Sequence, residues 1–486
     1  MSIGRQAAHG VAWYMVLGVS TRMLGLVGTL VLQRFISPDD YGAVNAASIV
    51  VTTASAFTSF SFGQYLIAKR APPHVAAQAA IVHVGMGLLA TAIVYALRGP
   101  IGRWVNAPAM GDYVFGYAVA NLVLDRVRYV PERLIMRALR FRTLAIINGT
   151  GELALTAAAL ATFHAWGAYA IMFGAVIRSL VTSVLFLNAA PRAEWFVRAR
   201  LRVADLRDLF SYGVPIMIAI VTDTATSKWD NVIVSMMFGP GVMARYNSAY
   251  NLADTPISNV AEHIGEVLMP SFSRMEPGQR ERAAIRAASL MGLVVSPLGV
   301  GLGAVAPTLA ATFFNAEWRT MIAPMLTILS VMTVFRPMPW SAIAYAQAVQ
   351  RTGVVMLSSF VRAIVVLSLV AAGGAIGGPS GACVGAGAGF ALHTVLTIIV
   401  SGRQTELPVG AYLLAVARPL LPCIPMFVAV LVVAHGLDVA GVPPLVSLVV
   451  QIVAGAIVYI GAAFVLVRSS ADELVRLGRE AIRRRR

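Results

Sequence analysis

The sequence predicts an all-α membrane protein with about fourteen transmembrane helices, and two observations lead to this fold class. The 486 residues are 58% hydrophobic and only 12% charged, and the mean hydropathy is +0.76. Too few charged side chains are therefore available to cover the surface of a water-soluble protein. The apolar residues also occur in many runs of about 20, the length that a helix needs to cross the hydrocarbon layer. These observations exclude a soluble enzyme or binding domain.

The apolar runs divide the chain into successive predicted spans. The first has full length and no small-residue cleavage site directly after it, so it is expected to be an uncleaved helix and not a signal peptide. The fourth, seventh and eighth are the least apolar. The spans are expected at residues 11–33, 42–67, 76–98, 110–133, 144–164, 166–188, 209–238, 245–272, 284–305, 321–348, 353–375, 379–400, 411–434 and 443–467.

Arginine and lysine lie mainly in alternate loops between these spans. With an even number of spans both termini share one side of the membrane, and the loops on that side hold most of the cations, for example at 137–142, 192–202 and 274–282. Because cytoplasmic loops are enriched in these residues, both termini are expected in the cytoplasm. The same placement accounts for the net charge of +16, so nucleic-acid binding is not expected.

The two halves of the chain resemble each other. In each half an apolar helix runs into a proline turn, a tyrosine and then a helix of small residues, at 32–47 and again at 235–249. Repeats of this kind are typical of transporters, with the substrate path between the halves. The expected organisation is an N-terminal lobe at 1–188, a cytoplasmic amphipathic linker at 189–208, a C-terminal lobe at 209–401, two further helices within 402–467 and a basic cytoplasmic tail at 468–486.

The basic tail has two interpretations that the sequence leaves open. It is expected either to lie on anionic lipid headgroups or to act only as a solubilising segment.

Catalytic motifs are missing from the sequence. It contains no G-x-x-x-x-G-K-[ST] phosphate loop and no pair of histidines with metal-ligand spacing. Cys383 and Cys423 both lie inside apolar runs, so neither a disulfide framework nor a thiolate metal site is predicted. The loops on the external side are short. The sequence therefore favours a protein that is not an enzyme and that needs no metal.

Several charged residues lie inside the predicted spans, where a charge is costly and usually faces protein or water. Arg22 lies at the middle of the first span on a face of small and polar residues, and Glu262 and Glu266 share one face of the eighth span. A hydrated central cavity would explain these faces. Close packing of helices through small residues explains a similar stripe on the second span equally well, but it does not explain the three charges.

The seventh span is the most polar. Asp223 and Asp230 share a face, and Lys228 lies close to the depth of Arg22 under the repeat. A structural ion pair with Lys228 is an equally good interpretation of these residues. The lone acid of the fifth span, Glu152, could serve only to neutralise Arg178 in the sixth.

The deep charges are weighted towards Arg and Lys, whereas a drug/cation antiporter needs acids in its cavity. A cationic cavity suits an anionic ligand, and the planar fork of arginine matches phosphate. The residues predicted to bind such an anionic ligand, for example a diphosphate headgroup, are Arg22, Arg178, Lys228, Arg336 and Arg362. Those predicted to couple transport to an ion or to balance these cations are Glu152, Asp223, Asp230, Glu262 and Glu266.

Four segments resemble the polysaccharide-transporter (Wzx-type) family of the MOP superfamily, which also contains multidrug transporters. They are the turn at 34–42 (Arg-Phe-Ile-Ser-Pro-Asp-Asp-Tyr-Gly), the basic stretch at 131–142, the segment from Trp229 to Pro256, and Phe313 to Trp318. In the last of these, Asn315 stands where the family usually has glycine. The matches occur in the family's order along most of the chain.

This resemblance implies a MATE-like fold of two six-helix lobes with two further C-terminal helices. It also implies flipping of undecaprenyl-diphosphate-linked repeat units across the bacterial inner membrane, from the cytoplasmic to the periplasmic leaflet, by alternating access. The product would be an exopolysaccharide, a capsule or O-antigen. No cofactor is implied beyond a coupling H⁺ or Na⁺. The implied partners are the lipid-linked glycan, membrane lipid, and a polysaccharide polymerase with its co-polymerase.

Three other functions remain open from the sequence. A flippase for the peptidoglycan lipid precursor belongs to the same superfamily, and so does a multidrug/cation antiporter. A membrane-bound glycan enzyme is the third, although the short external loops argue against it.

Overall fold

The computed structural model describes residue 25 and residues 28–483, and these form helices and connecting turns without any strand among them. The predicted all-α class is therefore confirmed. Eight of the described helices are long and apolar enough to cross a membrane, or nine if one bent pair counts as a single span. The chain is thus a multi-pass membrane protein, while the number of fourteen spans stays a prediction.

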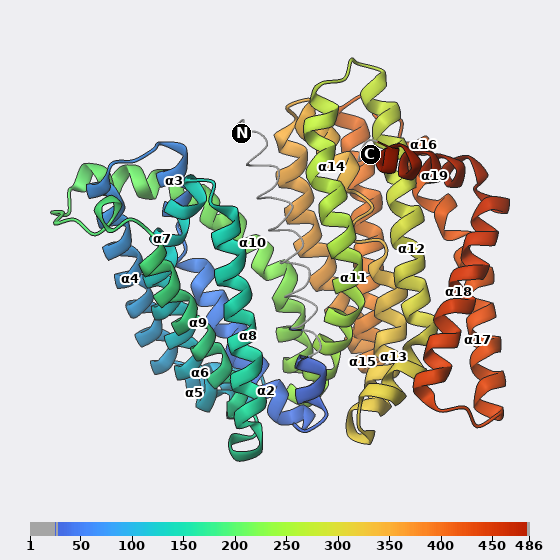
Figure 1. Cartoon of the computed structure of the whole chain (residues 1–486), viewed down its shortest axis with the longest axis horizontal. Coiled ribbons are helices and arrows are strands. Elements are labelled where there is room, and N and C mark those ends of the chain that lie inside the picture. Colours follow the sequence, from blue (N-terminus) through green and yellow to red (C-terminus); the bar gives the residue numbers. More distant parts are fainter. Residues whose placement is uncertain (1–24, 26–27, 484–486) are drawn as a thin grey trace. The chain divides into compact units, whose positions relative to one another are not determined.

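By its internal contacts the chain divides into two compact units, Met1–Ala244 and Arg245–Arg486. This division does not test the lobes that were derived from the repeat, and those lobes stay a prediction. The elements of unit 1 are α2 (Pro38–Phe57), α3 (Phe62–Ala68), α4 (Pro73–Ala96), α5 (Arg98–Trp104), η1 (Pro108–Met110), α6 (Gly111–Ala118), η2 (Val119–Leu124), α7 (Asp125–Arg137), α8 (Phe141–Trp166), α9 (Tyr169–Ala189), η3 (Arg192–Glu194) and α10 (Val203–Phe238) (Figure 1).

Helix α2 begins at the turn that the sequence singled out at 34–42. The Ser37 side chain accepts a hydrogen bond from the backbone N–H of Asp40 at 3.1 Å, and Pro38 occupies the first helical position. Both are favourable at a helix start, because the first N–H groups have no partner within the helix and proline lacks one. After Phe57 the chain bends by 45° into α3, so the predicted second span is a broken helix.

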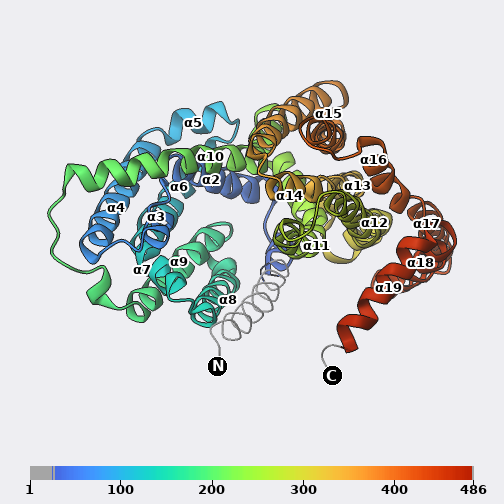
Figure 2. The same ribbon diagram turned by 90° about the horizontal axis from the view of Figure 1, so that it is seen from above.

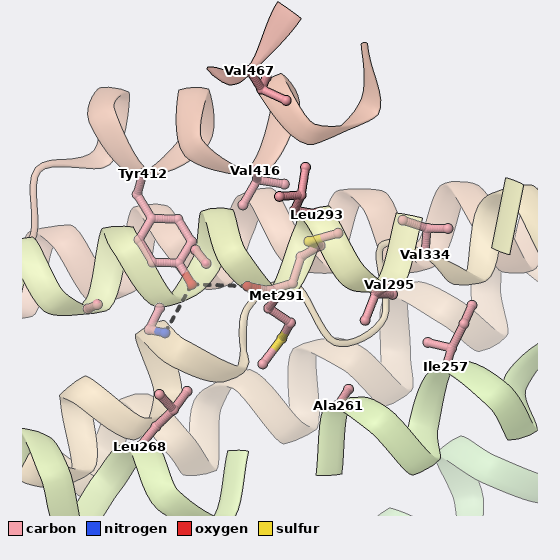
Figure 3. Packing of buried hydrophobic residues seen from close by; sticks show 14 of the residues in the cluster. Ile257, Ala261, Leu268, Met291, Leu293, Val295, Val334, Tyr412, Val416 and Val467 are labelled. Atoms are coloured by element: carbon pink, nitrogen blue, oxygen red, sulfur yellow. Dashed lines mark hydrogen bonds between the residues drawn. The ribbon is translucent and has the colours of Figure 1, made fainter. Parts of the chain in front are cut away.

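The elements of unit 2 are α11 (Pro240–Ser273), whose first residues belong to unit 1, α12 (Gln279–Phe313), α13 (Ala316–Thr333), α14 (Trp340–Ala348), α15 (Thr352–Gln404), α16 (Val409–Ala417), η4 (Arg418–Leu420), α17 (Cys423–Val439), α18 (Pro444–Leu466) and α19 (Arg468–Arg483). The core of this unit packs around α12, as Figure 3 shows for Met291, Leu293 and Val295. Within it the buried Tyr412 hydroxyl donates a hydrogen bond to the Met338 carbonyl at 3.0 Å.

Two predicted spans of unit 2 are not continuous α-helices. The span expected at 321–348 consists of α13 and α14, separated by a turn at 334–339 that contains Pro337 and Pro339. The span expected at 411–434 contains the 3₁₀ turn η4 between α16 and α17, and the stretch Val409–Val439 still counts as one helix long enough to cross a membrane. Proline removes a backbone donor and clashes with the preceding helical turn, which accounts for the breaks. The apolar pattern of the sequence does not reveal these proline turns within the spans.

Helix α15 contains the predicted boundary between two further spans. Its backbone leaves helical geometry at Gly377 and Gly378, so the two predicted spans at 353–375 and 379–400 are its two arms. The arms pack closely through glycines: a Cβ atom added at Gly385 would lie 2.0 Å from the carbonyl oxygen of Leu369.

Candidate functional site

A polar pocket of about 260 Å³ lies in unit 1, among α2, α4 and the continuous helix that η2 and α7 form. These helices group together when the unit is seen from above (Figure 2). The pocket lining combines hydroxyl groups with charged side chains from three predicted spans. Its residues are Thr52, Ser55, Ser59, His83, Asn121, Asp125, Arg126, Arg128, Tyr129, Glu132 and Arg133.

Arg126 holds the break between α2 and α3 in place. Its side chain is buried, with 3% of the residue exposed, and its guanidinium donates to the carbonyl oxygens of Ser55 at 2.9 Å and Thr58 at 3.1 Å. It also donates to the hydroxyls of the same two residues, both at 2.9 Å. The last carbonyls of a helix lack partners within the helix. Arg126 therefore caps the C-terminal end of α2 from a neighbouring helix.

The π-helical segment η2 precedes Arg126 by only two residues. A π segment accommodates extra residues in a turn and changes the direction of the side chains that follow it. Helix α4 approaches this segment closely, because a Cβ atom at Gly87 would lie 1.9 Å from the carbonyl oxygen of Leu122. On α4 the His83 ring lies 3.0 Å from the Arg126 guanidinium. The absence of a side chain at Gly87 thus allows α4 and η2 to meet.

The pocket has an excess of positive charge. Arg128 donates to both carboxylates of the lining, to Asp125 at 2.8 Å and to Glu132 at 3.0 Å, and the three arginines of the lining outnumber these two acids by one. Arg133 instead lies over the ring of Tyr129, with its guanidinium carbon 5.1 Å from the ring centroid. Its Nη1 lies 3.6 Å from the Met136 sulfur, and its buried Nε has no hydrogen-bond partner in the described part of the chain. Arg133 therefore forms no ion pair with either carboxylate of the pocket.

The arginines of this pocket are not among the site residues predicted from the sequence. Arg126, Arg128 and Arg133 lie in the second half of the fourth predicted span, and the segment from residue 131 on looked like the start of a basic loop. The dense alternation of charges from Asp125 to Arg133 within a predicted span was the signal that could have identified them.

Arg178 and Glu152 lie together on the hairpin of α8 and α9. The Arg178 guanidinium donates to the Glu152 carboxylate at 3.1 Å, and each side chain is about one-third exposed. The two residues thus form an ion pair, as the sequence suggested. Their part in substrate binding or ion coupling is not tested by this geometry.

We expect the pair to contribute about 1 kcal/mol to the stability of unit 1, since partly exposed ion pairs and polar contacts between membrane helices are worth little. The measurement is a double-mutant cycle with Glu152→Gln, Arg178→Gln and the double variant, each unfolded thermally in detergent. Additive losses in the double variant would show that the two side chains do not interact.

On α10 the predicted charges have different environments. Asp223 is exposed, Lys228 is half-buried, and Asp230 is buried. The Asp230 carboxylate accepts hydrogen bonds from the backbone N–H of Asn231 at 2.8 Å and from its side-chain amide at 2.9 Å. Asp230 is thus held in one orientation by its neighbour in sequence.

In unit 2, Arg336 forms an ion pair with Asp254 of α11, an acid that the sequence analysis did not nominate. Arg362 lies one turn after Ser358 on the first arm of α15, and Ser358 contacts the buried His393 of the second arm at 3.0 Å. Arg336 therefore lies beside a partly buried carboxylate, and Arg362 lies on the same arm of α15 as the buried Ser358.

Of the remaining three predicted site residues, the structure describes the side chain of only one. Glu262 is exposed on α11. Arg22 lies outside the described residues, and so does the side chain of Glu266.

The family model and the relatives that match this chain all name the biosynthesis of a polysaccharide in their descriptions. A family model described as polysaccharide biosynthesis protein matches residues 31–323. The chain is 22% identical over 407 residues to the lipopolysaccharide biosynthesis protein WzxC of Escherichia coli, covering 82% of this chain and 81% of that protein. It is also 22% identical over 376 residues to the succinoglycan biosynthesis transport protein ExoT of Rhizobium meliloti, covering 76% and 74%.

Solved structures show the same fold. The lipid II flippase MurJ in an inward closed conformation matches with a TM-score of 0.78 at 12% identity, over 94% of this chain and 99% of that one. An inward-facing multidrug transporter of the MATE family matches with a TM-score of 0.61 at 15% identity, over 84% and 98%. At such low identities the likeness shows the fold alone, and it confirms that the fold is MATE-like.

Proposed function

This chain belongs to the polysaccharide biosynthesis protein family, and from that premise we propose that it is a flippase for undecaprenyl-diphosphate-linked oligosaccharide repeat units. It moves them from the cytoplasmic to the periplasmic leaflet of the bacterial inner membrane by alternating access. The flipped units serve the synthesis of an exopolysaccharide, a capsule or O-antigen. A polymerase and its co-polymerase take them up afterwards.

The observation that carries the proposal is the positive pocket of unit 1. A diphosphate that crosses an apolar layer needs charge compensation, because an unpaired anion in a low-dielectric medium is strongly disfavoured. Arg133 offers its guanidinium to such a group, while the two nearby carboxylates are occupied by Arg128. The pocket also includes residues from the end of α7 that the arginine distribution assigns to the cytoplasm, the side on which the substrate would enter.

In this proposal Arg22, Arg178, Lys228, Arg336 and Arg362 accompany the diphosphate and any acidic sugars along the path. Transport is driven by H⁺ or Na⁺. The carboxylates that couple the ion, or balance the cations, are those of Glu152, Asp223, Asp230, Glu262 and Glu266.

Replacement of Arg133 by alanine is expected to reduce polymer export about tenfold or more, because a charge-assisted contact with phosphate contributes about 1.5–3 kcal/mol. The measurement is polymer yield in a producing host whose only flippase is this protein, with the protein level in the membrane determined in parallel. Arg133→Lys is expected to retain part of the export. Arg103→Ala, at an exposed arginine of α5, is the matched control and is expected to export normally.

Arg22→Ala and Lys228→Ala are tested singly in the same host. Normal polymer yield from both variants would remove those two residues from the path, and normal yield from Arg133→Ala would remove the pocket.

A second candidate function is transport of the peptidoglycan lipid precursor, because the fold is similar to that of the lipid II flippase. Rescue of a host that lacks its essential flippase for that precursor would favour this candidate. Drug resistance on expression, lost on replacement of Asp223, would instead indicate a multidrug/cation antiporter.

A further inference from the structure

The C-terminal helix α19 is docked on unit 2 along one side only. It follows α18 after a single residue and turns across the ends of α12 and α18 (Figure 1). Ala471 is buried in the core of the unit, Glu473 pairs with Arg286 of α12, and the hydroxyls of Ser470 and Ser289 lie 3.0 Å apart. The helix is therefore fixed to α12.

The arginines of α19 lie on the side that points away from α12. With 3.6 residues per turn, Arg468, Arg476 and Arg479 fall within an arc of about 80°, and Ser470, which contacts α12, lies on the opposite side of the helix. The side chain of Arg468 is 81% exposed and that of Arg476 is 63% exposed. The segment from 468 to 486 holds seven arginines and three acidic residues. One of the acids, Glu473, is already paired with α12.

Val475 is an accessible apolar residue of α19 that lies beside this arginine side, about 20° around the helix from Arg468. Val465 and Leu466, the last residues of the preceding span, are also exposed. The start of α19 therefore lies where a membrane-spanning helix leaves the hydrocarbon layer. A helix with cations next to accessible apolar side chains at that depth matches the headgroup region of a bilayer.

We propose that α19 is an interfacial helix that binds the anionic phospholipid headgroups of the leaflet in which α18 ends. Arg476 and Arg479 contact the headgroup phosphates, and Val475 contacts the upper acyl chains. The contacts of Arg468 with Asp472 at 3.6 Å and of Arg476 with Glu480 at 3.8 Å are exposed pairs within one helix. Such pairs are weak, so a lipid phosphate can replace them.

The charge balance favours lipid over an acidic protein partner. The headgroup phosphates of anionic lipids lie next to the end of every span, whereas the accessible arginine side of α19 is short and has no large apolar area beside it that a protein interface would need.

The test uses the full-length protein in a neutral detergent. It is titrated with phosphatidylglycerol or with zwitterionic phosphatidylcholine, and bound lipid is counted by native mass spectrometry. Arg476→Gln/Arg479→Gln is expected to lower the affinity for phosphatidylglycerol about 25-fold, at about fivefold for each arginine. Arg476→Lys/Arg479→Lys is expected to stay within about twofold of the wild type, because attraction to a leaflet depends on charge.

The matched control is Arg103→Gln/Arg319→Gln, which removes two exposed arginines elsewhere and is expected to leave the affinity unchanged. Equal affinity of the wild type and Arg476→Gln/Arg479→Gln for phosphatidylglycerol would overturn the proposal. Equal affinity of the wild type for the two lipids would also overturn it.

Discussion

Replacement of Arg126 by alanine is expected to lower the free energy of unfolding of unit 1 by about 3–5 kcal/mol. The change removes the guanidinium donor from the Thr58 carbonyl and from the hydroxyls of Ser55 and Thr58, and a buried polar group without a partner costs about 1–3 kcal/mol. The Ser55 carbonyl keeps the Thr58 backbone N–H as a donor at 3.2 Å. The expected fall in melting temperature is about 10 °C. Thermal unfolding of the purified protein in detergent measures it.

The break between α2 and α3 also shapes the polar pocket, because Ser55 and Ser59 of the lining lie at that break. Arg126→Ala is therefore expected to reduce polymer export as well, in the same host that tests Arg133.

Two variants make the Arg126 experiment specific. Arg126→Lys keeps the charge but has a single ammonium group in place of the planar fork, so an intermediate melting temperature is expected. Arg103→Ala removes an exposed arginine of the same unit and is expected to change stability by less than about 0.5 kcal/mol. If Arg126→Ala melted at the temperature of Arg103→Ala, the capping role of Arg126 would be wrong.

Replacement of Gly385 by alanine is expected to destabilise unit 2 by about 1–3 kcal/mol. The added Cβ would lie 2.0 Å from the Leu369 carbonyl oxygen and 2.7 Å from its carbon. Both atoms are backbone, so the two arms of α15 must move apart. Such a shift would also separate Ser358 from His393, which are 3.0 Å apart across the arms. Thermal unfolding in detergent is again the measurement.

The same helix provides the control for Gly385. No atom lies within 4 Å of a Cβ at Gly377, and its φ of −122° is accessible to alanine. Gly377→Ala is therefore expected to leave the melting temperature unchanged. Equal stability of the two variants would contradict the close packing of the arms.

The family and the fold class could be predicted from the sequence because they depend on short continuous segments, such as apolar runs and local turns. Apolar runs identify helices that cross a membrane whatever they pack against, and the turn at Ser37 and Pro38 starts a helix through local hydrogen bonding and proline geometry. The pair of Arg178 and Glu152 could also be anticipated, since consecutive antiparallel helices lie side by side.

Only the tertiary structure reveals which residues form the polar pocket. The partners of Arg126 on α2 lie 68 and 71 residues earlier in the chain, and no pattern within one span identifies them. Arg336 and Asp254 come from helices whose contact is set by packing. Apolar patterns also did not reveal the π segment η2 or the proline break between α13 and α14.

The sequence by itself determined that this protein is an all-helical membrane protein of the polysaccharide biosynthesis family and that its deep charges lean cationic. Only the tertiary structure decided which of these cations are already neutralised and which, like Arg133, form no ion pair among the described residues. The physical reason is that the environment of a charge in a membrane depends on side chains from other helices. Close approaches such as that at Gly87, and helix breaks such as that between α2 and α3, determine which helices those are.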